Sequence, residues 1–249
     1  MLKYITPHRS TVQQFMSARE NLFRPVHKGI RSMLYGSASR LQATNFGDLT
    51  ESNQIITRLK HDLGDSLSNC MLCLLRTHSS HEERDIFSAM RPHDPDVVAM
   101  MMKEHAEVAR RVRDVSKTCD EILDLTSPAR RIEAGDRLNQ EANDLFVYYL
   151  SHLNNEEATM VSVLWERFTD EQLRAMRAKF YDSVPLPLFH VWMRWALPSL
   201  NTNELLVLFS GLKADPETPR YKEWVKLARE TLDMPRLRAL EDQVGLGSA

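Results

Sequence analysis

The chain has 249 residues, which is enough for one domain with an appendage or for two small domains. Its 43% hydrophobic and 27% charged residues are ordinary for a soluble globular chain, and a net charge of −2 gives no argument for a nucleic-acid or anionic-membrane partner. We find no apolar run near the ~20 residues that span a bilayer and no apolar signal-peptide core. Three cysteines, an odd number, do not suggest a disulfide framework, so we expect a cytoplasmic protein.

Only eight glycines and few clustered β-branched residues predict an all-α fold. Residues 1–20 are polar with weak periodicity and are expected to form an N-terminal arm, either a short helix or a mobile segment. A first helix is expected to start near Asn21 or at Pro25 and to run toward Gly36. It carries His27 on its inward face.

Residues 41–50 are expected to form a loop, after which Thr50 or Ser52 would cap a second helix. Its apolar positions step by three or four residues, at Ile56, Leu59, Leu63, Leu67, Met71 and Leu75. His78 and Glu82 continue the same stripe. Because residues four apart lie on one helical face, this imidazole and this carboxylate point the same way, toward the core.

Asp94 as a cap and Pro95 at the first helical position predict the start of a third helix. This helix is expected to end near residues 122–125. His105 lies in the middle of its apolar stripe, so a third imidazole is predicted to face the core.

Ser127 and Pro128 repeat the cap-plus-proline pattern and predict a fourth helix. His152 and Glu156 lie on its apolar stripe, four residues apart like His78 and Glu82. Four long helices with short connections form an up-down-up-down bundle by default. We therefore predict a four-helix bundle over residues 21–167.

The pattern changes after this bundle. Thr169 begins a shorter helix, and six prolines divide the remainder into short amphipathic helices: Pro185, Pro187, Pro198, Pro216, Pro219 and Pro235. Residues 168–249 are predicted to form a smaller helical C-terminal module. An aromatic-rich segment around Trp192 and Trp195 is expected to pack onto the bundle or onto another subunit, with a substrate lid as a further alternative.

Six polar residues are predicted to point into the bundle: His27, His78, Glu82, His105, His152 and Glu156. An unpaired buried charge is costly, and buried carboxylates are usually paired or bound to metal. Imidazole with carboxylate suits iron, manganese or zinc rather than calcium or magnesium. Two cations would offset the two glutamates, each of which can bridge them through its two oxygens. Four histidines would then supply two terminal ligands per ion and leave positions open.

Two of the helices carry the same motif, His-x-x-x-Glu-Glu, at residues 78–83 and 152–157. With His27 before the first copy and His105 between the copies, the order resembles the hemerythrin-like, HHE cation-binding, family over roughly residues 20–166. The resemblance implies a non-haem di-iron centre with an oxo or hydroxo bridge, and it ranks iron ahead of manganese and zinc. It further implies that His27 and His152 serve one iron, and His78 and His105 the other.

The sequence departs from the oxygen-carrying hemerythrins at one point. These carry a further histidine one turn before the third-helix ligand, and that position is Met101 here. One turn after His105 is Ala109, which cannot bind a metal. The chain therefore resembles the four-histidine, two-glutamate branch, which is associated with iron-sulfur-centre repair, nitric oxide handling and iron or oxygen sensing.

Several neighbouring side chains are open to more than one interpretation. Glu83 and Glu157 step off the ligand face and are expected to be solvated or to support the ligands from outside. His81 could be a spare ligand, but a supporting position or the surface is favoured. Tyr149 is a candidate hydrogen-bond donor or radical relay, although packing is the commoner role. The Cys70-Met-Leu-Cys73 stretch is expected to pack rather than to carry redox chemistry.

Three functions are consistent with these residues. The first is a di-iron protein that binds or reacts with oxygen, nitric oxide or peroxide in sensing, stress response or iron-centre repair. The second is a di-iron oxygenase or oxidase acting on a small organic substrate, and the third is an iron-binding or storage protein. The expected partner is a diatomic gas or small molecule, with no nucleic acid and no membrane. A homo-oligomer formed through the C-terminal module is a further expectation.

Overall fold

The computed structural model describes residues 19–60, 71–213 and 219–246, and within these ranges it is all-α, as predicted. The N-terminal helices are α2 (Arg24–Ala43), α3 (Leu49–Lys60), α4 (Met71–Glu82), a π-helix η1 (Glu83–Phe87), α5 (Ser88–Met90), α6 (Pro95–Asp124) and α7 (Pro128–Arg167). The C-terminal helices are α8 (Asp170–Ser183), α9 (Leu186–Ser199), α10 (Thr202–Leu212), α11 (Pro219–Thr231) and α12 (Met234–Val244). No helix in the described part is long and apolar enough to cross a membrane.

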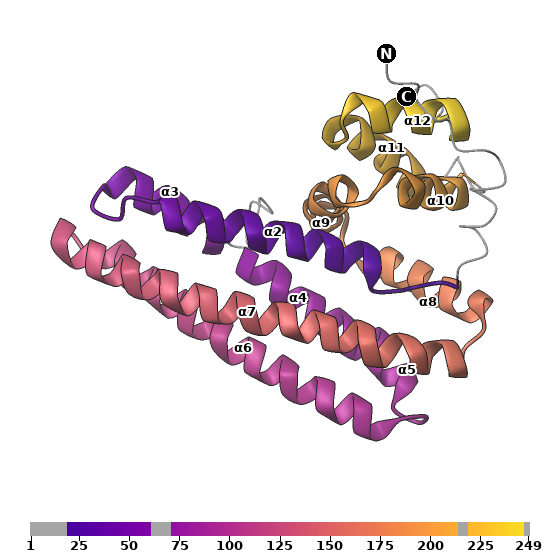
Figure 1. The fold of residues 1–249 in the computed structure, drawn as a ribbon, viewed down its shortest axis with the longest axis horizontal. Coiled ribbons are helices and arrows are strands. Elements are labelled where there is room, and N and C mark those ends of the chain that lie inside the picture. The colour runs from indigo at the N-terminus through magenta and orange to yellow at the C-terminus, as the bar shows by residue number, and fades with distance from the viewer. Residues whose placement is uncertain (1–18, 61–70, 214–218, 247–249) are drawn as a thin grey trace, which may run out of the picture.

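The N-terminal helices form an antiparallel bundle in which the chain direction alternates along α2, α4, α6 and α7 (Figure 1). In chain order this is the up-down-up-down arrangement that was predicted. The expected stripe positions Leu63 and Leu67, like residues 1–18 of the expected N-terminal arm, lie outside the described residues. All six predicted metal ligands lie within the described residues.

Helix starts follow the predicted local chemistry at two positions. The Asp94 side chain accepts a hydrogen bond from Val97 N–H at 3.2 Å, and Pro95 opens α6. Thr169 forms a capping box with Gln172, in which each side chain bonds the other residue's backbone N–H. These caps satisfy N–H groups that have no partner within their own helix.

Two predicted boundaries were wrong. The first helix continues past Gly36 to Ala43, because an isolated glycine in a helix costs only about 1 kcal/mol, which packing outweighs. The next helix starts at Leu49 rather than after Thr50 or Ser52. Asp48 provides the cap, since its carboxylate accepts the Glu51 N–H at 2.9 Å. The loop between the two helices is therefore shorter than predicted.

The C-terminal helices dock onto the bundle through α9, which lies across α2 (Figure 1). The two backbones approach so closely that a Cβ on Gly29 would lie 2.9 Å from the Ala196 backbone. Lys28 donates to both carboxylate oxygens of Glu204 in α10, at 2.6 and 2.8 Å. The expectation that the aromatic-rich segment packs onto the bundle is confirmed. Pro198, which was expected to end a segment, lies inside α9 one residue before its end.

The buried apolar residues of the described part fall into two clusters. The larger cluster runs from the bundle into the C-terminal helices and includes Ile30, Leu75, Val108, Leu153 and Trp192. The smaller cluster occupies one end of the bundle and consists of Phe23, Phe87, Met90, Val98, Met101, Met160, Val161, Leu164 and Leu173. The bundle core is thus interrupted between the two.

Candidate metal centre

A layer of polar side chains separates the two apolar clusters. On α7, Tyr149 and Leu153 belong to the larger cluster and Met160 to the smaller one, while His152 and Glu156 face the layer between them. The same order holds along each bundle helix, so all six predicted residues meet at one level: His27, His78, Glu82, His105, His152 and Glu156. Each is at most 5% exposed. Burial of so many polar groups in one layer requires compensation from within the layer.

Glu82 lies between histidines of three helices. Its Oε1 atom is 3.4 Å from Nε2 of His27 on α2, and its Oε2 atom is 3.0 Å from Nδ1 of His78. Oε2 is also 3.6 Å from Nε2 of His105 on α6. One carboxylate therefore reaches imidazoles on opposite sides of the layer.

Glu156 occupies the matching position on α7. Its Oε2 atom is 3.3 Å from Nε2 of His27 and 3.8 Å from Nε2 of His152. The side chain is fully buried. Both glutamates thus lie centrally, with the four histidines around them.

The histidines form two pairs. The rings of His27 and His78 have centroids 5.1 Å apart, and those of His105 and His152 are 4.8 Å apart. Two overlapping groups have ligand atoms within 4.8 Å of one another, namely His27, His78 and Glu82, and Glu82, His105, His152 and Glu156. The expected pairing of His27 with His152, and of His78 with His105, is therefore wrong. The pairs instead join the first helix to the second and the third to the fourth.

Several inward-facing atoms of this layer have no hydrogen-bond partner among the described residues. They are Oε2 of Glu82, both carboxylate oxygens of Glu156, and Nε2 of His105 and His152. A buried polar atom without a partner costs about 1–3 kcal/mol, and a charged one more. Cations bound between these oxygens and nitrogens would satisfy them. The donor set fits a metal that accepts both imidazole and carboxylate ligands.

Electrostatics in the metal-free layer favour protons on two of the histidines. Burial lowers the pKa of His27, but the nearby carboxylates of Glu156, Glu157 and Glu82 outweigh it and raise that pKa well above its ordinary value. Burial is likewise outweighed at His105, where Glu82 is the largest opposing influence and the pKa rises to about 9. Protonation of these two histidines would therefore offset part of the negative charge of the two glutamates.

The two glutamates titrate in opposite directions. Burial raises the pKa of Glu82, but the charge of His78 and the nearby imidazoles of His105 and His27 reverse the effect and hold it well below its ordinary value. Burial and the nearby charge of Glu82 raise the pKa of Glu156. Two close carboxylates cannot both ionise without cost unless cations lie between them.

Three carboxylates outside the layer fix the orientation of three histidines. Nδ1 of His27 lies 2.8 Å from Glu157, and Arg31 holds the same carboxylate at 2.7 Å. The corresponding Nδ1 contacts, His105 with Glu83 and His152 with Glu104, are also 2.8 Å. In the neutral imidazole, an Nδ1–H that donates outward leaves Nε2 unprotonated and facing the layer.

Two of these supporting carboxylates, Glu83 and Glu157, were already candidates for that position, and their contacts bear it out. Sequence reasoning missed Glu104. The signal that could have found it is adjacency, because all three carboxylates are direct neighbours of a layer residue in the sequence. Glu104 precedes His105 on α6 and supports a histidine of the facing helix α7.

His78 differs from the other three histidines. Its Nδ1 atom faces Glu82, and the hydroxyl of Tyr149 lies 3.5 Å from the same atom. That hydroxyl also donates to the Leu75 carbonyl at 3.4 Å. Burial raises the pKa of Tyr149 well above its ordinary value, so it remains a neutral donor. The side chain both packs in the core and contacts the layer.

The π-helix η1 begins directly after Glu82. Within it Glu83 reaches His105, and Phe87 stacks on the His105 ring at a centroid distance of 5.0 Å. A π-helical turn inserts extra residues into a helix and frequently marks a functional site. Here it brings both Glu83 and Phe87 into contact with His105.

Other candidates of the sequence lie apart from the layer. His81 is buried between Phe180 and Trp192, which rules out a position at the surface. It belongs to neither ligand group. Cys70 lies outside the described residues. Cys73 is a buried thiol, as expected for a packing role.

Comparison with known proteins adds one match. A family model described as "Hemerythrin HHE cation binding domain" matches residues 20–164. Neither the curated proteins nor the solved structures gave a match. The matched region begins just before α2, ends within the last turn of α7, and contains the entire polar layer.

Proposed function

The chain belongs to the hemerythrin HHE cation-binding family, and from this premise we propose that it is a non-haem di-iron protein that reacts with oxygen, nitric oxide or peroxide. The observation that carries the proposal is the buried layer of four histidines and two glutamates, whose inward oxygens and nitrogens lack partners. The settings that fit such a protein are sensing, stress response and iron-centre repair.

In this proposal six residues bind the metal. His27 and His78 would be the terminal ligands of one ion, and His105 and His152 those of the other, in keeping with their ring distances. Glu82 and Glu156 would bridge the two ions, because each glutamate lies near histidines of both pairs. Mixed imidazole and carboxylate donors favour iron over calcium or magnesium, with manganese and zinc as weaker candidates.

The position of Met101 supports a reactive rather than a carrier role. This side chain is fully buried in the smaller apolar cluster, one turn before His105, where it adds no nitrogen ligand. Two histidines and the two shared glutamates would leave coordination positions open on each ion. A bound iron pair would supply two redox equivalents and these open positions for a small molecule.

Metal content tests the ligand assignment. We expect two irons per chain after anaerobic iron loading and desalting, and less than one in His78→Ala and His152→Ala. His93→Ala is the matched control, because His93 is exposed in the turn before α6 and its removal should leave two irons. Metal analysis with Mössbauer spectroscopy measures the content and the coupling of the ions. Two coupled irons in both ligand variants would refute the assignment.

A further inference from the structure

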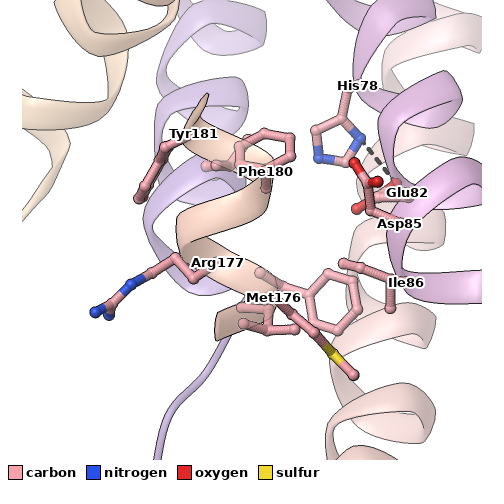
Figure 2. A pocket seen from close by; sticks show the side chains of 11 residues that line it. His78, Glu82, Asp85, Ile86, Met176, Arg177, Phe180 and Tyr181 are labelled. Atoms are coloured by element: carbon pink, nitrogen blue, oxygen red, sulfur yellow. Dashed lines mark ion pairs between the residues drawn. The ribbon is translucent and has the colours of Figure 1, made fainter. Parts of the chain in front are cut away.

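A pocket opens next to the candidate metal centre on the side that the bundle shares with α8. Its volume is about 480 Å³, part of it open to solvent. His78 and Glu82 line one end of it, and Figure 2 shows the Phe180 ring pointing from α8 toward His78. This total includes space outside the surface of the chain, and the enclosed part beside His78 and Glu82 is much smaller. An organic molecule would therefore lie partly in this enclosed part and partly in the opening toward solvent.

The wall opposite the metal layer comes from outside the four-helix bundle. Helix α8 supplies it, and contacts tie this helix down on both sides. Arg177 of α8 donates to Glu20 at 2.6 Å, while Arg84 of η1 donates to Ser183 at 2.7 Å. The pocket therefore depends on a helix that lies beyond the family domain.

The lining is apolar around most of its surface. Phe23 and Phe180 contribute aromatic rings, and Ile86 and Met176 contribute aliphatic and thioether surface. Aromatic rings favour stacked or edge-on contact with another ring, and methionine adapts to irregular shapes. Such a lining gains free energy by removing an apolar body from water.

Two charged groups of the lining, Asp85 and Arg177, are already engaged with protein partners. Asp85 accepts hydrogen bonds from Arg84 and lies 3.8 Å from Lys179. The Arg177 guanidinium turns away from His78 (Figure 2) toward its partner Glu20. Two carboxylates, Glu82 and Asp85, face the pocket and oppose a negatively charged ligand. The lining therefore opposes anions, and Glu82, with His78, is already assigned to the candidate metal centre.

We propose that this pocket binds a small, uncharged, mainly apolar organic molecule, with one edge against His78 and Glu82. For the identity of the neighbouring metal, this proposal rests on the proposed function. It adds an organic substrate to the diatomic molecule that the centre would bind. It thereby favours an oxidising enzyme among the functions open to the family domain.

Calorimetric titration with indole as the probe tests the pocket directly. We expect metal-free and iron-loaded full-length protein to bind one indole per chain. Met176→Trp should weaken this binding at least tenfold, because a half-buried side chain at the lining is replaced by one that fills the space. Met100→Trp is the matched control, since Met100 is 40% exposed on α6, and it should bind indole as the parent does.

Two further measurements keep the result interpretable. Indole-3-acetate should bind the metal-free protein at least tenfold more weakly than indole, because its carboxylate meets Glu82 and Asp85. Proton relaxation of indole should be enhanced by iron in the parent and in Met100→Trp, and this enhancement should fall in Met176→Trp. Equal indole affinity in both tryptophan variants, with unchanged helicity, would overturn the pocket assignment.

The same samples separate the two proposals. A protein that holds two irons but binds no indole refutes the organic substrate and leaves the di-iron function standing. A protein that binds indole in the pocket but retains no iron refutes the di-iron function and leaves the pocket standing.

Discussion

At the scale of single residues, the carboxylates outside the layer determine the tautomer and the ring orientation of three histidines. Each of Glu83, Glu104 and Glu157 accepts a hydrogen bond from the Nδ1–H of a histidine at 2.8 Å. The bond selects one tautomer and one ring orientation and makes Nε2 a better donor to a metal. A glutamate beside a ligand can thus matter almost as much as the ligand.

Glu104→Gln provides the residue-scale prediction. The substitution preserves the shape of the side chain but removes the charge that holds the His152 ring, so iron affinity should fall roughly 10- to 100-fold. Competition with a chromophoric chelator measures this affinity. Glu107→Gln is the control, because Glu107 lies three residues further along α6 and pairs with Arg110 and Arg111. Equal affinities in the two variants would show that Glu104 does not position His152.

At the scale of elements, the contact between α2 and α9 connects the bundle to the C-terminal helices. This contact depends on Gly29, because any side chain there would strike the Ala196 backbone. Helix α9 also carries Trp192, whose ring lies 6.1 Å from that of His78. A shift of α9 would therefore change the surroundings of His78 in the polar layer.

Gly29→Ala and Gly36→Ala should change stability in opposite directions. Alanine at Gly29 overpacks the α2–α9 contact and should destabilise the fold by about 1–3 kcal/mol. A Cβ at Gly36 would meet only the flexible Arg40 side chain, at 3.4 Å, so this alanine should stabilise by about 0.5–1 kcal/mol through helix propensity. Urea unfolding of both variants measures the free energies. Stabilisation by both alanines would contradict the close packing of α9 on α2.

At the scale of the whole molecule, protons and metal compete for one layer and both are linked to folding. Two histidines of the metal-free layer, His27 and His105, have raised pKa values. Their protonated forms stabilise the metal-free fold, whereas metal binding requires neutral imidazole. Iron binding near pH 7 should therefore release roughly two protons per chain.

The pH dependence of melting follows from the same shifts. The pKa of His105 is about 9 in the fold, against an ordinary value near 6.5. Its stabilising effect is complete below pH 6.5 and is lost as pH rises through 9. The melting temperature of chelated protein should fall across this window, while the increase that metal adds should grow. Calorimetric scans at several pH values measure both. A chelated protein that becomes more stable between pH 6.5 and 9 would contradict the raised pKa.

The sequence by itself determined what is local to a helix. His78 with Glu82 and His152 with Glu156 share faces because the α-helical repeat brings residues four apart onto one side. The caps Asp94 and Thr169 were readable for the same reason, since a cap acts on backbone groups within its own first turn. The all-α bundle and the six residues of its polar layer follow from such patterns.

Only the tertiary structure decided which residues of different helices contact one another. The pairing of His27 with His78, the support of His152 by Glu104, and the closing of the pocket by Phe180 all join residues far apart in the chain. Such contacts depend on how helices rotate and approach, as where Gly29 admits Ala196, and no spacing within one helix encodes them. Helical periodicity sets which side of a helix is polar, and packing sets which side chains meet there.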